Sequence, residues 1–272
     1  FIHAASDWQL GKGEGGGTPA TIDRIETSLR NGYGRLLELR NMGRNLPQIA
    51  VPCLGDLVEQ CNGHYDQQTF TTDLNMREQR RLGWRLLLKH ILVYAPVCDS
   101  MIVTGIGGNH GEARKDGKSF TNFHDNDDLL MLDAPSDIIS ARKELSHVSI
   151  DMPDEDPLAH VVELSGVKVG LAHGHQFRRG TGAEQKAKNW WEGQALGFTP
   201  VAKAKILLTG HFHSSMKAEY SKYGRTWFQM PAQDGGSYWF ESGSGLSSPA
   251  GAHTMTVSSA FDWRGYKDEQ IV

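Results

Sequence analysis

Cysteine is scarce in this sequence, and its spacing excludes the common cysteine-based sites. The 3 cysteines among 272 residues are Cys53, Cys61 and Cys98, and no two of them form a Cys-x-x-Cys pair. A disulfide framework is therefore not expected, and a reducing compartment, the cytoplasm, is the simplest location. We expect each cysteine to be a small buried apolar side chain.

Long apolar runs are absent as well. No stretch approaches the roughly 18 consecutive apolar residues of a membrane-spanning helix, so we expect no membrane association. Residues 1–5 are too few for a signal peptide and lack its positively charged flank. The chain begins at a strand-like segment without Met, which suggests that it has been trimmed and that an upstream region is missing.

Positive charge is not in excess. The formal net charge is −4, which argues against a broad electrostatic surface for nucleic acid. A local basic rim around an acidic metal site is still compatible with this value, because bound divalent cations reverse the local sign. The 39% of hydrophobic residues is ordinary for a globular protein. Without an internal repeat or a low-complexity linker, residues 1–272 are expected to form one domain.

Hydrophobic periodicity predicts strands that alternate with helices, followed by a strand-rich second half. The predicted strands span residues 2–6, 48–54, 100–105, 147–150, 160–164, 168–172 and 205–208. The predicted helices span residues 21–42, 66–94, 128–145 and 181–196. Residues 11–17, with their 5 glycines, and the polar residues 112–127 are predicted to be loops, and strands with glycine turns are expected in 214–259. This order predicts an α/β fold.

Five short polar motifs each follow a predicted strand. They are Ser6-Asp7-Trp8-Gln9, Gly55-Asp56-Leu57-Val58-Glu59, Gly108-Asn109-His110, Ala172-His173-Gly174-His175 and Gly210-His211-Phe212-His213. Ligands bind at the carboxyl ends of strands in α/β sheets, because loops converge there on a rigid support. Neighbouring glycines let the chain turn sharply and let a metal ion or phosphate approach closely.

Together the motifs supply the ligands of a dinuclear metal site. Two divalent ions about 3.5–4 Å apart need a bridging carboxylate and several flanking ligands, and they acidify a water molecule that becomes the nucleophile. The candidate metal ligands are Asp7, Gln9, Asp56, Asn109, His173, His211 and His213. Mixed oxygen and nitrogen ligands without thiolate favour two divalent ions of the Mn²⁺ type, with Fe, Zn²⁺, Ni and Co as alternatives.

The order of these motifs resembles that of the calcineurin-like metallophosphoesterases, from Asp7 to about His213. The resemblance implies a four-layer α/β/β/α sandwich with two mixed β-sheets and the metals above the sheet edges. It also implies that Asp7 and His213 hold a first metal ion and that Asp56 bridges both metal ions. Asn109, His173 and His211 would then hold a second metal ion. As catalytic residues, His110 would lie beside the substrate phosphate and Glu59 would orient it, since a carboxylate keeps an imidazole protonated near neutral pH.

Two positions depart from the pattern of that family. Gln9 stands where the family usually has His, and an amide oxygen is a weaker and harder ligand, so the first metal site is expected to be weaker and biased toward Mn²⁺. Gly111-Glu112 follows Asn109-His110 where the family often has an acid directly. Either Glu112 reaches back to His110 or Glu59 acts alone.

Further residues are candidates for substrate contact. Arg114, His124 and Arg178 are predicted to bind substrate, with Lys115, Lys118 and Arg179 completing a basic rim, although solvated turns explain these charges equally well. We expect His175 to pack against the metal ligands rather than to contact a metal ion or the substrate. Packing is the default for the aromatic clusters Trp190-Trp191 and Tyr238-Trp239-Phe240, and base stacking is the alternative.

The metal site sets the reaction, whereas the substrate stays open. The segment from Ser6 to Lys12 resembles Mre11/SbcD-type nucleases, and Pro231 to Ser237 resembles Mre11-like metallophosphoesterases of bacteriophages, which implies DNA processing or repair in a host cytoplasm and an ATPase partner. Gln9 and the acidic net charge favour the alternative, a phosphodiesterase or pyrophosphatase for cyclic or diphosphate nucleotides. A second alternative is an inactive binding module of the same fold.

Overall fold

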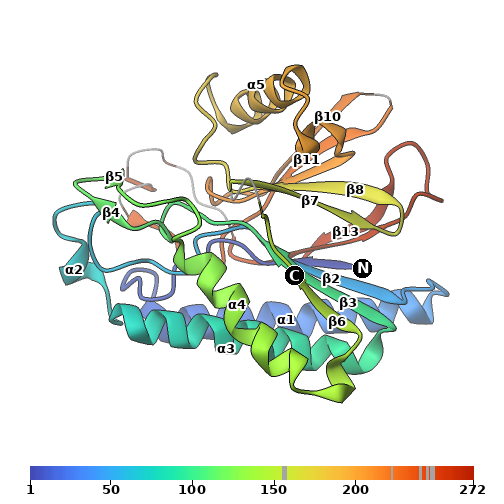
Figure 1. The fold of residues 1–272 in the computed structure, drawn as a ribbon, viewed down its shortest axis with the longest axis horizontal. Coiled ribbons are helices and arrows are strands. Elements are labelled where there is room, and N and C mark those ends of the chain that lie inside the picture. The colour runs from blue at the N-terminus through green and yellow to red at the C-terminus, as the bar shows by residue number, and fades with distance from the viewer. Residues whose placement is uncertain (155–157, 222, 239–240, 243–244, 246–248) are drawn as a thin grey trace.

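Two mixed β-sheets face each other at the centre of the computed structural model (Figure 1). It describes residues 1–272 except 155–157, 222, 239–240, 243–244 and 246–248. The larger sheet, in the order β13-β12-β1-β2-β3-β6, consists of β1 Ile2–Ala4, β2 Gln48–Cys53, β3 Ser100–Gly105, β6 Val148–Asp151, β12 His253–Val257 and β13 Tyr266–Ile271. The smaller sheet, in the order β10-β11-β9-β8-β7, consists of β7 Ala159–Leu164, β8 Val167–Ala172, β9 Ile206–Thr209, β10 Met216–Ser221 and β11 Arg225–Gln229.

Helices cover the outer faces of both sheets (Figure 1). The larger sheet is covered by α1 Gly17–Asn41, α3 Met76–Tyr94 and α4 Asp127–Ser140. The smaller sheet is covered by α5 Ala183–Leu196. The short elements are α2 Gln68–Thr71, the hairpin β4 Arg114–Lys115 and β5 Lys118–Ser119, and 3₁₀ turns at Ala95–Val97, Lys143–Leu145 and Pro200–Lys203. The predicted fold class is confirmed: helices lie on both outer faces of two mixed sheets.

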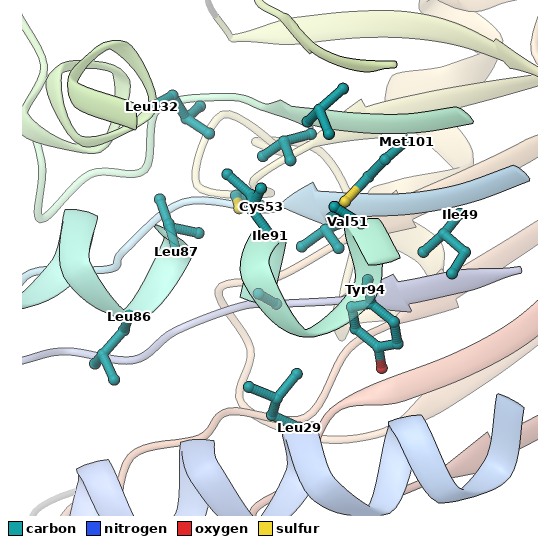
Figure 2. Close-up of a cluster of buried hydrophobic side chains, with 14 of the residues drawn as sticks. Leu29, Ile49, Val51, Cys53, Leu86, Leu87, Ile91, Tyr94, Met101 and Leu132 are labelled. Carbon is teal, nitrogen blue, oxygen red and sulfur yellow. The ribbon is translucent and has the colours of Figure 1, made fainter. Parts of the chain in front are cut away.

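Three buried clusters hold the layers together. Strand β2 shows why: Ile49 and Val51 point toward the helices and Ala50 toward the smaller sheet, so both faces of the strand are buried. Figure 2 shows Ile49, Val51 and Cys53 of β2 beside Leu87 and Ile91 of α3. Each such leucine or isoleucine stabilises the fold by about 1.5–3 kcal/mol.

The predicted helix over residues 66–94 is wrong. The structure has a short helix, α2, and then a separate helix that begins at Met76. Asn75 caps α3, because its side chain accepts from the Glu78 N–H while the Glu78 carboxylate accepts from the Asn75 N–H. Thr72 is extended between the two helices and forms a β-bridge with Lys12.

Other boundaries differ less. Helix α1 begins at Gly17, inside the predicted glycine loop, and α4 ends at Ser140 rather than at residue 145, where a 3₁₀ turn follows. The predicted loop over residues 112–127 contains the β4–β5 hairpin. Within the part of the chain that the structure describes, no helix is long and apolar enough to cross a membrane.

Candidate metal centre

The candidate centre lies where several parallel strands end. Strands β1, β2 and β3 run parallel in the larger sheet, as do β8 and β9 in the smaller one, and each is followed by a predicted motif. Their carboxyl ends lie on the side of α2 and the β4–β5 hairpin in Figure 1. Residues at this edge have strained backbone: φ is positive, between 43° and 74°, at Asp7, Gln9, Asp56, His211 and His213. Such residues cost about 1–3 kcal/mol each and cluster at functional sites.

Asp56, His173 and His211 converge after β2, β8 and β9. One ligand atom from each residue lies within 4.8 Å of the other two. His173 donates from Nε2 to Asp56 Oδ2 at 2.9 Å and from Nδ1 to the Leu54 carbonyl at 2.6 Å. Asp56 and His173 are fully buried, whereas His211 is half-buried. We call these three residues with Asn109 the Asp56 half of the site.

Charge attraction outweighs burial for the Asp56–His173 pair. Burial raises the pKa of Asp56, but His173 and His110 bring it well below its ordinary value. Burial lowers the pKa of His173, but Asp56 raises it to about 10. Burial and the charge of His173 lower the pKa of His211 to about 3, so this ring is neutral at pH 7. A cation that binds here would displace the His173 proton.

Asn109 lies between two residues that contact Asp56, and its side-chain carbonyl oxygen has no partner among the described residues. Its Oδ1 is buried and accepts no hydrogen bond from the described residues, which costs about 1–3 kcal/mol. The next residue, His110, donates its backbone N–H to Asp56 Oδ1 at 2.7 Å. On the other side, a Cβ at Gly108 would lie 2.1 Å from Asp56 Oδ1, so only glycine permits this approach. A carboxylate, two imidazoles and an orphaned amide oxygen fit a divalent ion.

Asp128 supports this half from α4, and sequence reasoning missed it. Its Oδ2 accepts from the backbone N–H groups of Asp56 at 2.9 Å and Gly108 at 2.8 Å, and its Oδ1 accepts from Leu57 at 2.8 Å. Asn126 adds a hydrogen bond to the Gly108 carbonyl at 2.9 Å. One buried carboxylate thus joins the loops that carry Asp56 and Asn109. The only local signal was an Asn-x-Asp cap at a helix start.

Asp7, Gln9 and His213 form what we call the Asp7 half. Asp7 is fully buried, and its carboxylate accepts from the His211 N–H at 3.1 Å and from the Ser6 hydroxyl. His213 Nε2 lies 3.3 Å from Asp7 Oδ1. Burial raises the pKa of Asp7, but the His213 charge outweighs it and lowers the pKa.

Two residues absent from the predicted site complete the Asp7 half. Lys12 Nζ donates to Gln9 Oε1 at 2.9 Å and forms an ion pair with Asp234. Asp234 Oδ1 also lies 3.6 Å from His213 Nδ1. Lys12 follows Gln9 by three positions, but Asp234 lies 222 residues further on, so no local pattern joins them.

His110 faces the site from the loop after β3. Its Nδ1 donates to the Glu59 carbonyl at 2.9 Å and lies 3.4 Å from Glu59 Oε2, while His64 stacks on the ring at 4.3 Å. The Tyr65 hydroxyl donates to Glu59 Oε1 at 3.3 Å. Burial raises the pKa of Glu59 despite the His110 charge. Of the two acids considered for orienting His110, the structure places Glu59 against it.

Glu112 is engaged elsewhere. It pairs with Arg114 at 2.8 Å and contacts His175 Nε2 at 3.3 Å. Arg114, a predicted substrate contact, is therefore already paired, and it also donates to the Gly117 carbonyl at 3.0 Å. His175 lies beside the His173 ring, with centroids 5.4 Å apart.

The other predicted contacts are more peripheral. His124 is exposed, and Arg178 is exposed in a surface hollow with Arg179, Asn189 and Trp190. Trp191 is buried, and its Nε1 donates to the Val201 carbonyl at 3.0 Å, as packing requires. In the second aromatic cluster Tyr238 is exposed, while Trp239 and Phe240 lie outside the described residues.

Comparisons with known proteins give only distant likenesses. No family model and no curated protein matches the sequence. A single mutant of Vps29 from Entamoeba histolytica has 12% identity and a TM-score of 0.42, over 100% of this chain and 98% of that chain. Vps29 from Chaetomium thermophilum has 11% identity and a TM-score of 0.42, over 94% and 84%. A predicted phosphoesterase from Streptococcus pneumoniae has 14% identity and a TM-score of 0.28, over 55% and 66%. At such values the interpretation of the site depends on its own geometry.

Proposed function

We propose that this protein hydrolyses phosphate esters with a divalent metal ion held by the Asp56 half of the site. The convergence of Asp56, His173 and His211, with ligand atoms within 4.8 Å, carries the proposal. The orphaned Oδ1 of Asn109 and the strained backbone at Asp56 and His211 support it. The motif order that resembles calcineurin-like metallophosphoesterases favours the same reaction.

The residues around the ion have separate roles in this proposal. A bound divalent cation supplies Lewis acidity, which stabilises charge on a phosphoryl oxygen and lowers the pKa of a water molecule. His110 is held by the Glu59 carbonyl through Nδ1, so Nε2 is the ring atom that exchanges a proton with the leaving oxygen. Its side chain is 17% exposed, which leaves the ring within reach of a substrate.

For the substrate, we propose a phosphodiester of DNA, as in Mre11-like nucleases. Exposed aromatic rings accompany the hairpin lysines: Phe120 and Phe123 follow Lys118. Tyr65, which contacts Glu59, is 47% exposed. Aromatic faces beside cationic groups bind single-stranded nucleic acid by stacking and charge. A small nucleotide with a cyclic or diphosphate group uses the same chemistry and is the alternative substrate.

Hydrolysis assays test the proposal. Purified protein with Mn²⁺ should cleave bis-p-nitrophenyl phosphate, and linear DNA should then be cleaved faster than cyclic or diphosphate nucleotides. His110→Ala should lose turnover by about 10²–10⁴-fold and keep its metal affinity. The matched control is His147→Ala, since His147 precedes the amino end of β6, where its Nε2 donates to the Ala95 carbonyl at 2.9 Å.

Each result has a defined meaning. Absence of turnover with Mn²⁺, Fe²⁺, Co²⁺, Ni²⁺ and Zn²⁺ in metal-loaded protein would leave the inactive binding module as the better account. Faster cleavage of nucleotides than of DNA would replace the nuclease proposal by the alternative. If His110→Ala lost metal and kept turnover, the role given to His110 would be wrong.

A further inference from the structure

The Asp7 half does not fit a divalent ion as the Asp56 half does. Gln9 Oε1, the atom that would bind the ion, already accepts from Lys12 Nζ at 2.9 Å. Both nitrogens of His213 face carboxylates, at 3.3 Å from Asp7 and 3.6 Å from Asp234. The Asp7–His213 pair resembles the Asp56–His173 pair, so the difference lies in the amide oxygens: Gln9 Oε1 has a lysine partner, whereas Asn109 Oδ1 has no partner among the described residues.

Lys12 is a fixed part of the site rather than a mobile surface lysine. Its side chain is only 12% exposed, and that of its partner Asp234 is 2% exposed. The backbone on either side is anchored, because the Lys12 N–H donates to the Gln9 carbonyl at 3.0 Å and the Gly13 N–H donates to the Thr71 carbonyl at 2.9 Å. The ammonium group is therefore held in one place.

Asp234 is held just as firmly. The backbone N–H groups of Gln233 and Asp234 both donate to the Asp7 carbonyl at 3.2 Å. At the next position, a Cβ on Gly235 would lie 2.4 Å from Gly15, so this loop packs backbone to backbone against the glycine segment. The ion pair is thus fixed to Asp7 itself, and the positive charge of Lys12 belongs to the Asp7 half.

We propose that the Lys12 ammonium takes the place of a second metal ion, so that the protein works with one divalent ion and one built-in cation. This inference rests on the proposed function. An ammonium is a compact charge with three donors; here Gln9 and Asp234 accept from it. By fixing the Gln9 amide oxygen, it leaves Gln9 Nε2 3.5 Å from His110 Nε2, where the amide can donate to that nitrogen while the ring is neutral.

Metal stoichiometry tests the inference without any assay of activity. Wild-type protein dialysed against excess Mn²⁺ should retain one ion per chain by elemental analysis. Its electron paramagnetic resonance spectrum should be that of an isolated Mn²⁺ ion, without the exchange coupling of a pair. Asp56→Asn should lose the ion, whereas Asp7→Asn should keep it.

A double variant, Lys12→Met with Gln9→His, should convert the Asp7 half into a second metal site. The change leaves Asp234 without its cation and supplies an imidazole in place of the amide, so two coupled ions per chain are expected. Lys12→Arg keeps the charge and should keep one ion. Lys188→Met, on α5 with a side chain that is 44% exposed, is the matched control and should also keep one ion.

The outcomes separate this inference from the proposed function. Two ions in the wild type would overturn the role of Lys12 and leave a metal-dependent phosphoesterase standing. No ion in the wild type would contradict the proposed function, and the inference would fall with it. One ion both in the wild type and in a folded double variant would show that Lys12 does not exclude the second ion.

Discussion

The two halves of the site use similar residues but balance their charges differently. In the Asp56 half, the carboxylate contacts His173, and an imidazole that loses its proton becomes a ligand. In the Asp7 half, the Lys12 ammonium donates to Gln9 Oε1 and forms an ion pair with Asp234. An ammonium has donors but no acceptor, so it cannot become a metal ligand. The first arrangement can exchange a proton for a metal ion, whereas the second already contains its cation.

The comparison shows that a motif with suitable ligand atoms is not enough to define a metal site, because other residues of the chain can already bind those atoms. Gln9 and Asn109 both offer an amide oxygen, yet Gln9 Oε1 has a lysine partner while Asn109 Oδ1 is orphaned. The difference comes from residues outside the motifs. Four measurements can break or sharpen the comparison.

The largest effect is expected from Asp56→Asn. It removes the carboxylate that holds His173, and with it the charge that balances a cation. Mn²⁺ affinity measured by calorimetry should fall by more than the roughly 10–100-fold loss typical of an outer-shell partner. The thermal stabilisation by Mn²⁺, about 2.7 kcal/mol at 100 times the Kd, should disappear.

Asp262→Asn is the matched control for this change, because Asp262 lies on an exposed turn where it pairs with Arg264 at 2.9 Å. Its Mn²⁺ affinity should equal that of the wild type. An Asp56→Asn protein with wild-type affinity would mean that the Asp56 half is not the metal site.

A smaller loss is expected from Asp128→Asn. The amide cannot accept from all three backbone N–H groups that Asp128 now binds, so the loops carrying Asp56 and Asn109 should loosen. We expect a loss of about 10–100-fold in Mn²⁺ affinity and about 1–3 kcal/mol in the free energy of unfolding. Calorimetry and urea unfolding measure the two effects.

Asp127→Asn separates a specific role from a general one. Asp127 is the preceding residue on α4, but its carboxylate binds Arg80 at 2.7 Å and Gln60 at 2.8 Å. This variant should lose stability without a comparable loss of Mn²⁺ affinity. Equal losses of Mn²⁺ affinity in both variants would mean that Asp128 only stabilises the start of α4 and has no specific role at the metal site.

The metal-free protein should lose stability as pH rises from about 8 to about 10, above the range in which the buried amino terminus, whose pKa burial lowers from 8.0 to about 5, opposes the change. Asp56 raises the pKa of His173 from its ordinary value of 6.5 to about 10. The charged pair therefore makes its full contribution to the free energy of unfolding below pH 6.5, and this contribution is lost as pH approaches 10. The slope for one proton is at most about 1.4 kcal/mol per pH unit. Urea unfolding with a chelator over this range measures it, and Asp56→Asn should flatten the curve. A flat wild-type curve would contradict the charge balance assigned to this half.

Local patterns predicted the parts of the molecule that local physics decides. Motifs that follow strands were readable, because parallel strands bring their carboxyl ends to one edge, and Asp56, His173 and His211 indeed meet there. The break before α3 was missed, although Asn75 and Glu78 have the spacing of a capping box.

Partners distant in the chain could not be predicted in the same way. Lys12 and Asp234 are 222 residues apart, and Asp56 and Asp128 are 72 apart. Neither pair has a spacing that a helix or strand imposes, so only the assembled sheets bring them together. In our proposal these contacts decide which half can take a metal ion, whereas the motifs alone predicted two metal ions with a weaker first site.

The smallest effect on metal affinity is expected from Asp7→Asn, and it tests the comparison most directly. In a site with two equivalent ions, Asp7 would be a ligand, and its loss would remove one ion and weaken the other. With Lys12 as the built-in cation, Asp7 instead accepts from the His211 N–H at 3.1 Å and pairs with His213 at 3.3 Å.

The Asn variant should therefore lose about 1–3 kcal/mol in the free energy of unfolding, while its Mn²⁺ affinity should change less than the roughly 10-fold lower bound for an outer-shell partner. Titration calorimetry on Asp7→Asn and Asp56→Asn under identical conditions gives the contrast. Equal losses in the two variants would make the halves equivalent, and Lys12 would then be a neighbour of the metal site rather than part of it.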